Sequence, residues 1–151
     1  MSERPILLQA DHLKKWFPVR KGVFSKAAQY VKAVDDVSLV IREGETLGIV
    51  GESGCGKSTL ARTMMRLIEP TEGTVLFQGQ DLTSADKESL RRMRRDIQII
   101  FQDPYASLNP RQRVSDILAE PFLIHKLGSR EAAMKRAEEL LDLVGLSQDS
   151  M

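Results

Sequence analysis

Cysteine is nearly absent from this 151-residue chain, which contains only Cys55. One thiol cannot close an internal disulfide bond, and it cannot supply a zinc site built from several thiolates. Hydrophobic residues make up 42% of the chain and charged residues 28%. These shares, with a length that suits one domain, are typical of a soluble globular protein and exclude disorder, collagen and a disulfide scaffold.

Long hydrophobic runs are missing as well. No segment approaches the ~20 apolar residues that a membrane-spanning helix needs. The N-terminal stretch MSERPILLQADH carries charges at Glu3, Arg4 and Asp11 and has no apolar run of signal-peptide length. The sequence therefore predicts a cytoplasmic protein.

An excess of charge of one sign is also missing. The 22 basic and 21 acidic side chains leave a formal net charge of +1. Binding to nucleic acid through bulk electrostatics usually needs a clear basic excess. We therefore expect no nucleic-acid partner.

Hydrophobic periodicity predicts an α/β chain whose strands come first and whose last part is helical. Strands are predicted at 6–17, 31–41, 46–50, 74–78 and 97–101. Helices are predicted at 57–68, 86–94, 114–126 and 130–144. The run TLGIV at 46–50 is apolar throughout, as expected of a buried central strand. Few of these strands could enter one parallel sheet, so a doubly wound domain built from them would be incomplete.

One segment fits the phosphate-binding pattern G-x-x-x-x-G-K-[ST] at every position: Gly51-Glu52-Ser53-Gly54-Cys55-Gly56-Lys57-Ser58. A predicted strand leads into it and a predicted helix leads out, which is the context that such a loop requires. Its glycines let the backbone aim N–H groups at phosphate oxygens, and the helix N-terminus adds a positive dipole end. We expect Lys57 to reach the β- and γ-phosphates, Ser58 to coordinate Mg²⁺ and Thr59 to donate to the α-phosphate. Cys55 is interpreted as a small residue that fills the tight turn.

A second signal is Gln102, which follows the apolar run Ile99-Ile100-Phe101. A polar side chain at the end of a strand is well placed to reach a metal ion or an attacking water at the carboxyl edge of a sheet. The phosphate-binding loop alone leaves kinases, GTPases, motor ATPases and transporter ATPases open. The guanine-reading motif N-K-x-D is absent from the sequence, which argues against a GTPase.

Together, the stretches GESGCGKST and IQIIFQDPYASLNPR resemble the ATP-binding subunits of ABC importers, above all those of the oligopeptide and dipeptide group. The stretches VKAVDDVSLVIREGETLGIVGESGCGKSTLAR and EPTEGTVLFQGQDL are similar to the first strands and the P-loop region of that group. The resemblance covers almost the whole chain. It implies an ABC-type P-loop NTPase core with an N-terminal antiparallel β subdomain over 1–103, and part of a helical subdomain over 104–151.

The resemblance also implies the activity and its residues. The activity is ATP hydrolysis that energises import of peptides or a related small solute, since nickel and glutathione systems share this kind of ATPase. Lys57 and Gln102 would be catalytic, Ser58 and Gln102 would hold Mg²⁺, and the loop from Gly51 to Thr59 would hold ATP. Gln102 would be the Q-loop glutamine. Phe17 would stack on adenine, with Tyr30 as the alternative.

The partners implied are transmembrane permease subunits, which the helical subdomain would contact, and a second ATPase subunit of the same or a related sequence. Two such subunits would sandwich two ATP molecules. A solute-binding protein would act indirectly. The expected location is peripheral, on the inner face of the cell membrane.

Three parts of the family's pattern are missing from the sequence: the signature resembling LSGGQ, the second acidic motif and the switch histidine. His12 and His125 lie elsewhere and are interpreted as ordinary histidines. We therefore expect the chain to be the N-terminal portion of a longer ATPase, ending before the signature, with little hydrolysis of its own. The alternative is a nucleotide-binding fragment without turnover, and a third reading is a P-loop kinase or GTPase.

Overall fold

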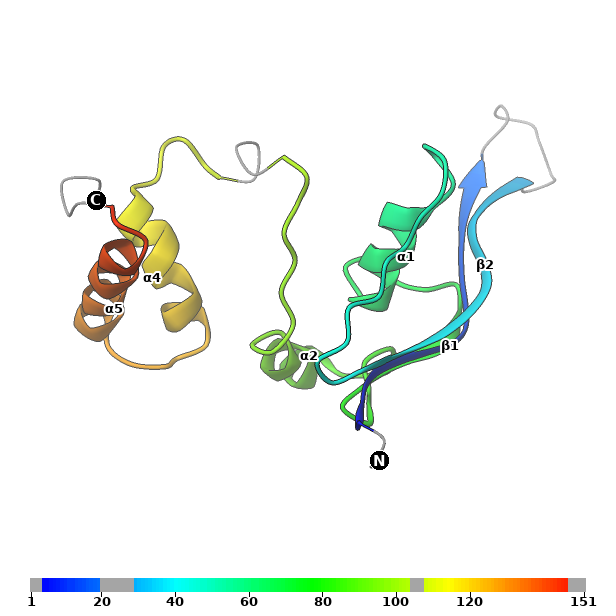
Figure 1. The fold of residues 1–151 in the computed structure, drawn as a ribbon, viewed down its shortest axis with the longest axis horizontal. Helices are drawn as coiled ribbons and strands as arrows, with labels where there is room; N and C mark the ends of the chain where they lie inside the picture. The colour runs from blue at the N-terminus through cyan, green and yellow to red at the C-terminus, as the bar shows by residue number, and fades with distance from the viewer. Residues whose placement is uncertain (1–3, 20–28, 104–107, 147–151) are drawn as a thin grey trace. The chain divides into compact units, whose positions relative to one another are not determined.

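The computed structural model describes residues 4–19, 29–103 and 108–146. The chain divides into two compact units, Met1–Leu90 and Arg91–Met151. The first unit holds a β-sheet and helix α1, and the second holds helices α4 and α5 (Figure 1). The short helix α2 (Lys87–Met93) spans the boundary in the sequence.

The first unit is built on an antiparallel sheet of four strands in the order β2-β1-β3-β4. These strands are β1 (Ile6–Val19), β2 (Gln29–Arg42), β3 (Glu72–Phe77) and β4 (Gln80–Asp81). Every neighbouring pair is antiparallel, which confirms the predicted N-terminal antiparallel β subdomain. Helix α1 (Lys57–Met64) contacts β1 and β2, and its Leu60 and Met64 are buried. The strands contribute Leu13, Val34 and Val75 to the same unit's core.

An irregularity interrupts the pairing of β1 with β2 at His12 and Asp36. Both residues have positive φ, 46° and 59°, and the register shifts between Ala10 and Leu13. The His12 Nδ1–H group donates to Asp36 Oδ1 at 2.7 Å. This hydrogen bond, with the charges of Asp36 and Asp11, raises the pKa of His12 above its ordinary value. The pair therefore favours the protonated imidazole in the folded chain.

The raised pKa of His12 gives a pH-dependent prediction. The pair's full contribution to stability is present below the unfolded histidine's pKa, and it is lost as the pH rises through the higher folded value. We expect Asp36→Asn to lower the thermal midpoint more at pH 5.5 than at pH 9, since asparagine also tolerates positive φ. Thermal unfolding of the intact protein at both pH values measures this. An equal decrease of the thermal midpoint at the two pH values would contradict the stabilisation of protonated His12 by Asp36.

Two predicted strands, 46–50 and 97–101, are not strands in the structure. In the described part of the chain, neither segment pairs with a neighbouring strand, and Val50 and Ile100 are 96% and 94% exposed. Their apolar patterns indicate a tendency to be buried, but a strand also needs a hydrogen-bonding neighbour, which periodicity cannot supply. Helix α1 is also shorter than the predicted 57–68, because it ends at Met64.

The second unit contains α4 (Val114–Ile124) and α5 (Arg130–Leu143), which pack against each other. The buried residues of this pair are small: Ser115, Ala119, Ala133 and Ala137, with Leu141 the one large side chain among them. Ser129 caps α5, since its hydroxyl accepts a hydrogen bond from the Ala132 amide at 3.2 Å. The predicted helical region is thus present, with α4 ending at Ile124 rather than at 126.

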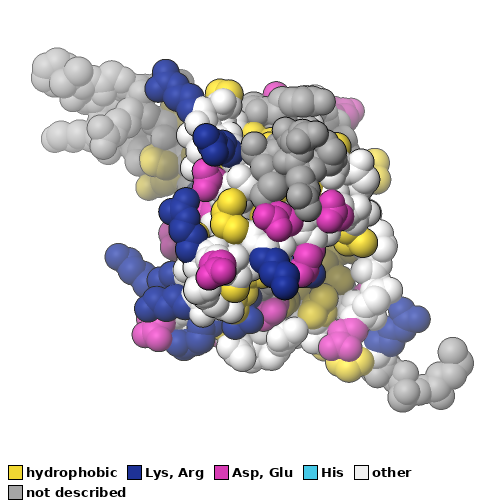
Figure 2. All heavy atoms as spheres, turned by 90° about the vertical axis from the view of Figure 1, so that its left-hand side faces the viewer, with side chains coloured by type: hydrophobic (Ala, Val, Ile, Leu, Met, Phe, Trp, Pro, Cys, Tyr) yellow, Lys and Arg dark blue, Asp and Glu magenta, His cyan; other side chains and the backbone are white. Residues whose placement is uncertain are grey.

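The surface carries charges of both signs. Figure 2 shows lysine and arginine side chains interspersed with aspartate and glutamate over one face. Surface ion pairs of this kind include Lys14 with Glu72 and Arg136 with Glu139. Among the helices that the structure describes, none combines the length and the apolar character needed to cross a membrane.

Candidate functional site

The phosphate-binding pattern at 51–58 forms a tight loop that ends where α1 begins. Gly56 is the N-cap of α1, with a left-handed φ of 101°, and no side chain caps the helix. The first bond along the helix runs from the Leu60 amide to the Gly56 carbonyl at 2.8 Å. Earlier amides of a first turn have no partner inside the helix. No acidic side chain lies in this turn, so the positive end of the helix dipole faces the loop without a carboxylate beside it.

Lys57 folds back over this loop. Its ammonium donates to the carbonyl oxygens of Gly51 at 2.8 Å and Glu52 at 2.6 Å, and it lies 3.5 Å from Cys55 Sγ. The positive charge is therefore held inside the loop, where phosphate oxygens are expected. Hydrogen bonds from an ammonium to phosphate are stronger than those to neutral carbonyls, so an entering polyphosphate can compete for this side chain.

The loop faces a cavity of about 340 Å³ in the first unit, and β2 forms one wall of it. The lining residues from β2 are Lys32, Ala33, Val34, Asp35 and Val37. Those from the loop and from the segments beside it are Ile49, Val50, Cys55, Gly56, Lys57 and Leu60. The cavity therefore joins the predicted loop to charged residues of β2, Lys32 and Asp35, that the sequence analysis missed. Nothing in a strand pattern marks them, since their place beside the loop comes from the fold.

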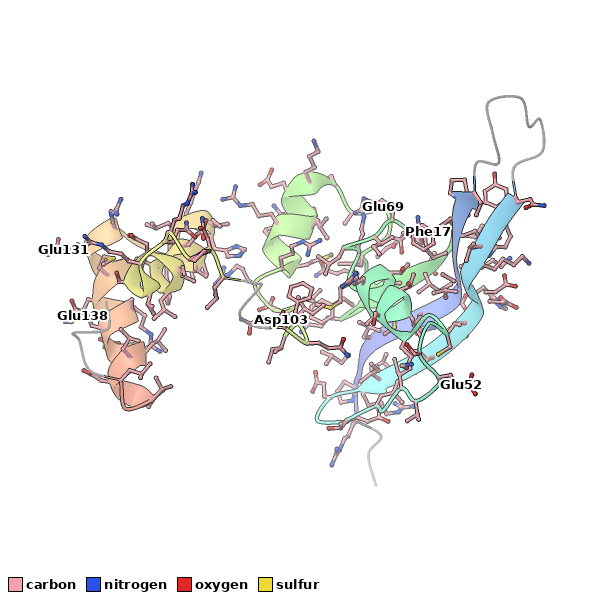
Figure 3. The ribbon with its side chains drawn as sticks, turned by 90° about the horizontal axis from the view of Figure 1, so that it is seen from above. Phe17, Glu52, Glu69, Asp103, Glu131 and Glu138 are labelled. Carbon is pink, nitrogen blue, oxygen red and sulfur yellow. The ribbon has the colours of Figure 1, made fainter. Side chains whose placement is uncertain are left out.

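The two adenine-stacking candidates lie at one end of the β1–β2 ribbon. Phe17 pairs in register with Val31, and Tyr30 pairs with Pro18. Phe17 is 38% exposed, and the Lys15 ammonium lies 5.0 Å from its ring centroid. Tyr30 is 54% exposed, and its ring centroid is 6.4 Å from that of Trp16. Figure 3 marks Phe17 on β1 and Glu52 on the loop.

The remaining predicted residues fall in different places. Ser53, Gly54 and Ser58 are exposed on the loop or the first turn of α1, and Thr59 is half-buried. Gln102 belongs to the second unit, where it is exposed and follows a segment without regular secondary structure. Pro104 to Ser107 of the motif around Gln102 lie outside the described residues.

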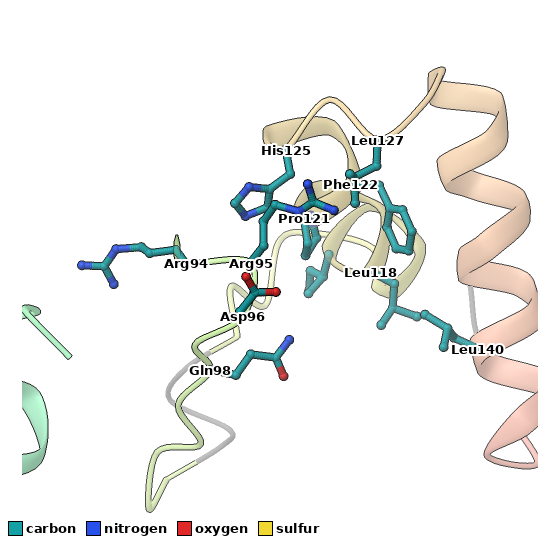
Figure 4. Close-up of a pocket in the computed structure, with 11 residues that line it drawn as sticks. Arg94, Arg95, Asp96, Gln98, Leu118, Pro121, Phe122, His125, Leu127 and Leu140 are labelled. Carbon is teal, nitrogen blue, oxygen red and sulfur yellow. The ribbon is translucent and has the colours of Figure 1, made fainter. Parts of the chain in front are cut away.

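A second cavity, of about 620 Å³, lies within the second unit beside α4. Figure 4 shows Arg95, Asp96 and His125 toward one side of it and Leu118, Phe122 and Leu140 toward the other. Arg91 in α2 also donates to the carbonyl of Ile124 at the end of α4. This cavity thus has a charged side and an apolar side.

Comparisons with known proteins agree with this architecture. The family described as ABC transporter matches residues 34–151. The chain is 52% identical over 146 residues to the oligopeptide transport ATP-binding protein AppF of Bacillus subtilis (strain 168), covering 96% of this chain and 44% of that protein. It is 46% identical over 140 residues to the di/tripeptide transport ATP-binding protein DppF of Pseudomonas aeruginosa (strain UCBPP-PA14), covering 93% of this chain and 43% of that protein. The chain therefore spans less than half the length of these relatives.

A solved structure has the same fold. It is a dimeric post-hydrolysis state of the ATP-binding cassette MJ0796 bound to ADP and phosphate. The similarity has a TM-score of 0.75 at 29% identity and covers 95% of this chain and 59% of that one. The predicted resemblance and fold class are confirmed by these matches, and the family match extends over most of the sequence. The chain belongs to the ABC transporter family.

Proposed function

We propose that this chain binds ATP through the loop at 51–58, as part of an ATPase subunit that energises import of peptides or a related small solute. The observation that carries the proposal is the placement of the Lys57 ammonium inside a loop that opens at the uncapped N-terminus of α1. The similarity to proteins named for oligopeptide and di/tripeptide transport supports the solute class.

Binding of ATP would change the hydrogen-bond acceptors of the Lys57 ammonium. Its ammonium leaves the carbonyls of Gly51 and Glu52 and donates to the β- and γ-phosphate oxygens. The amides of the loop and of the first turn donate to the same phosphates, and Thr59 donates to the α-phosphate. During hydrolysis, negative charge spreads over the γ-phosphoryl oxygens, and the Lys57 charge stabilises it. Phe17 stacks on the adenine ring, with Tyr30 as the alternative.

The donor set proposed for Mg²⁺ is the Ser58 hydroxyl and the Gln102 side-chain amide oxygen. Both are oxygen ligands, which suit a hard cation that usually keeps several waters and binds substrate phosphates. Ser58 is exposed beside Lys57 on the first turn of α1. The roles of Gln102 in the metal site and in catalysis rest on the resemblance. When bound, the metal ion neutralises phosphate charge.

The proposed domains are a nucleotide-binding core with its β subdomain over 1–103 and a partial helical subdomain over 104–151. Contact of the helices α4 and α5 with transmembrane permease subunits is supported by the similarity to transport ATP-binding proteins. The dimeric structure of the related cassette supports a second ATPase subunit as partner. A solute-binding protein acts indirectly, and the complex lies on the inner face of the cell membrane.

A second candidate is nucleotide binding without turnover by this chain alone. It is favoured by the coverage of the relatives, since the chain matches only 44% of AppF. Measurable ATP turnover by the 151-residue chain would count against this candidate.

Protection of Cys55 from alkylation tests the proposal at the loop itself. Cys55 is exposed, and its sulfur lies 3.5 Å from the Lys57 ammonium, so phosphates bound there cover the thiol. We expect Mg-ATP at a hundred times its Kd to slow maleimide labelling at least about tenfold, because roughly 1% of the sites remain empty. Mass spectrometry of the Cys55 peptide from the intact protein measures the rate, with AMP as the control ligand. Equal rates with and without Mg-ATP would overturn the proposal.

A further inference from the structure

The cavity beside α4 has no role in the function proposed above. Its volume of about 620 Å³ lies within the range of about 300–1,000 Å³ that is typical of small-molecule sites. Such sites are mostly apolar and contain a few polar groups that fix the orientation of the ligand. Every residue that lines this cavity belongs to the second unit, so the cavity forms within one compact part of the chain.

The charged side of the cavity is a turn that follows α2. The Arg95 amide donates to the Arg92 carbonyl at 3.1 Å, and the Asp96 amide donates to the Met93 carbonyl at 3.0 Å. The Arg95 and Asp96 side chains are exposed, and Figure 4 shows both on the same side of the cavity. Arg94 also lines the cavity, but it is half-buried and takes part in another interaction. The turn therefore presents a guanidinium and a carboxylate next to each other.

The two helices of the second unit supply the apolar side. Leu118 and Phe122 come from α4, and Leu140 comes from α5. All three side chains are half-buried, so the packing of the two helices leaves part of their apolar surface uncovered. A hydrogen bond from Arg91 to the carbonyl of Ile124, the last residue of α4, joins the charged turn to this helix. The cavity thus has charges of both signs across from an apolar wall.

We propose that this cavity binds a short peptide that has free termini and apolar side chains. The Arg95 guanidinium donates charge-assisted hydrogen bonds to the peptide's C-terminal carboxylate, and Asp96 accepts one from its N-terminal ammonium. The apolar side chains of the peptide leave water for the surface of Leu118, Phe122 and Leu140. A ligand with charge of one sign would bring a like charge to Arg95 or Asp96, which favours a ligand with both signs.

The inference concerns the second unit and does not depend on nucleotide binding at the loop, so its failure would leave the proposed function standing. A free apolar amino acid such as leucine offers the same three kinds of group as the peptide. The experiment therefore separates these two sources of the ligand.

Calorimetry of the intact protein at neutral pH tests the proposal with leucyl-leucine as the probe. We expect a Kd of about 0.1–1 mM, which suits a ligand of this size. The C-terminal amide and the N-acetyl derivative of the same peptide should each bind about tenfold more weakly, because each lacks one charged end. Diglycine should also bind at least about tenfold more weakly, because it has no side chains to bury. Leucine should bind more weakly than leucyl-leucine for the same reason.

Substitutions assign each end of the peptide to its residue. Arg95→Gln should weaken leucyl-leucine about tenfold and leave the affinity of the C-terminal amide unchanged, since the amide already lacks the carboxylate. Asp96→Asn should weaken leucyl-leucine by a similar factor and leave the N-acetyl derivative unchanged. Arg92→Gln is the matched control, because Arg92 is exposed like Arg95 but does not line the cavity. We expect its affinities to match wild type.

Four results would overturn the inference. The first is that wild type does not bind leucyl-leucine at millimolar concentrations. The second is that Arg95→Gln and Asp96→Asn both bind it as Arg92→Gln does. The third is that leucine binds as tightly as leucyl-leucine, which would assign the cavity to free amino acids. The fourth is that a peptide blocked at both ends binds equally well, which would assign it to an internal segment of another protein.

Discussion

We expect Gly56→Ala to displace the loop at 51–58 from β2 and to abolish nucleotide binding. A Cβ at this position would lie 2.1 Å from the Ala33 carbonyl oxygen, which is a backbone atom that cannot turn aside. The φ of 101° adds strain of about 1–2 kcal/mol for any residue with a side chain. With the steric clash, we expect a total loss of more than about 4 kcal/mol in the free energy of unfolding. Chemical denaturation of the intact protein measures this loss.

Gly54→Ala is the matched control for stability. Gly54 has a similar positive φ of 83°, but apart from its two chain neighbours no residue has a heavy atom within 4 Å of the position of its added Cβ. Only the backbone strain then applies, so we expect a loss of about 1–2 kcal/mol. Equal losses for the two substitutions would show that close contact between the loop and β2 is not what positions the P-loop.

Much of the first unit could be predicted from periodicity. The alternating residues of β1 and β2 and the short apolar run of β3 each lie within a few residues of the predicted strands. The turn at 51–58 could be predicted because its backbone depends on local residues alone: glycines at the turns and a lysine at the start of a helix. Features of this kind depend on residues that are neighbours in the sequence, so the sequence alone is enough to predict them.

The errors arose where long-range contacts decide the structure. The segments 46–50 and 97–101 have the composition of buried strands, yet the described residues provide no strand to pair with either one. Lys32 and Asp35 were not predicted to line the cavity, because their place there comes from the packing of β2 against the loop, where Gly56 lies close to Ala33. The hydrogen bonds from Lys57 to the loop carbonyls depend equally on the folded turn.

The measurement that tests the central claim most directly is Mg-ATP binding by the intact protein and its Lys57→Ala variant. The alanine removes charge-assisted hydrogen bonds to the phosphates, so we predict an affinity about 10- to 100-fold weaker. Folding should change little, because Gly51 and Glu52, whose carbonyls lose their donor, are exposed residues. Lys14→Ala, which removes a positive charge away from the cavity, should bind like wild type. An affinity of Lys57→Ala equal to that of wild type would contradict the claim that the loop at 51–58 holds the phosphates.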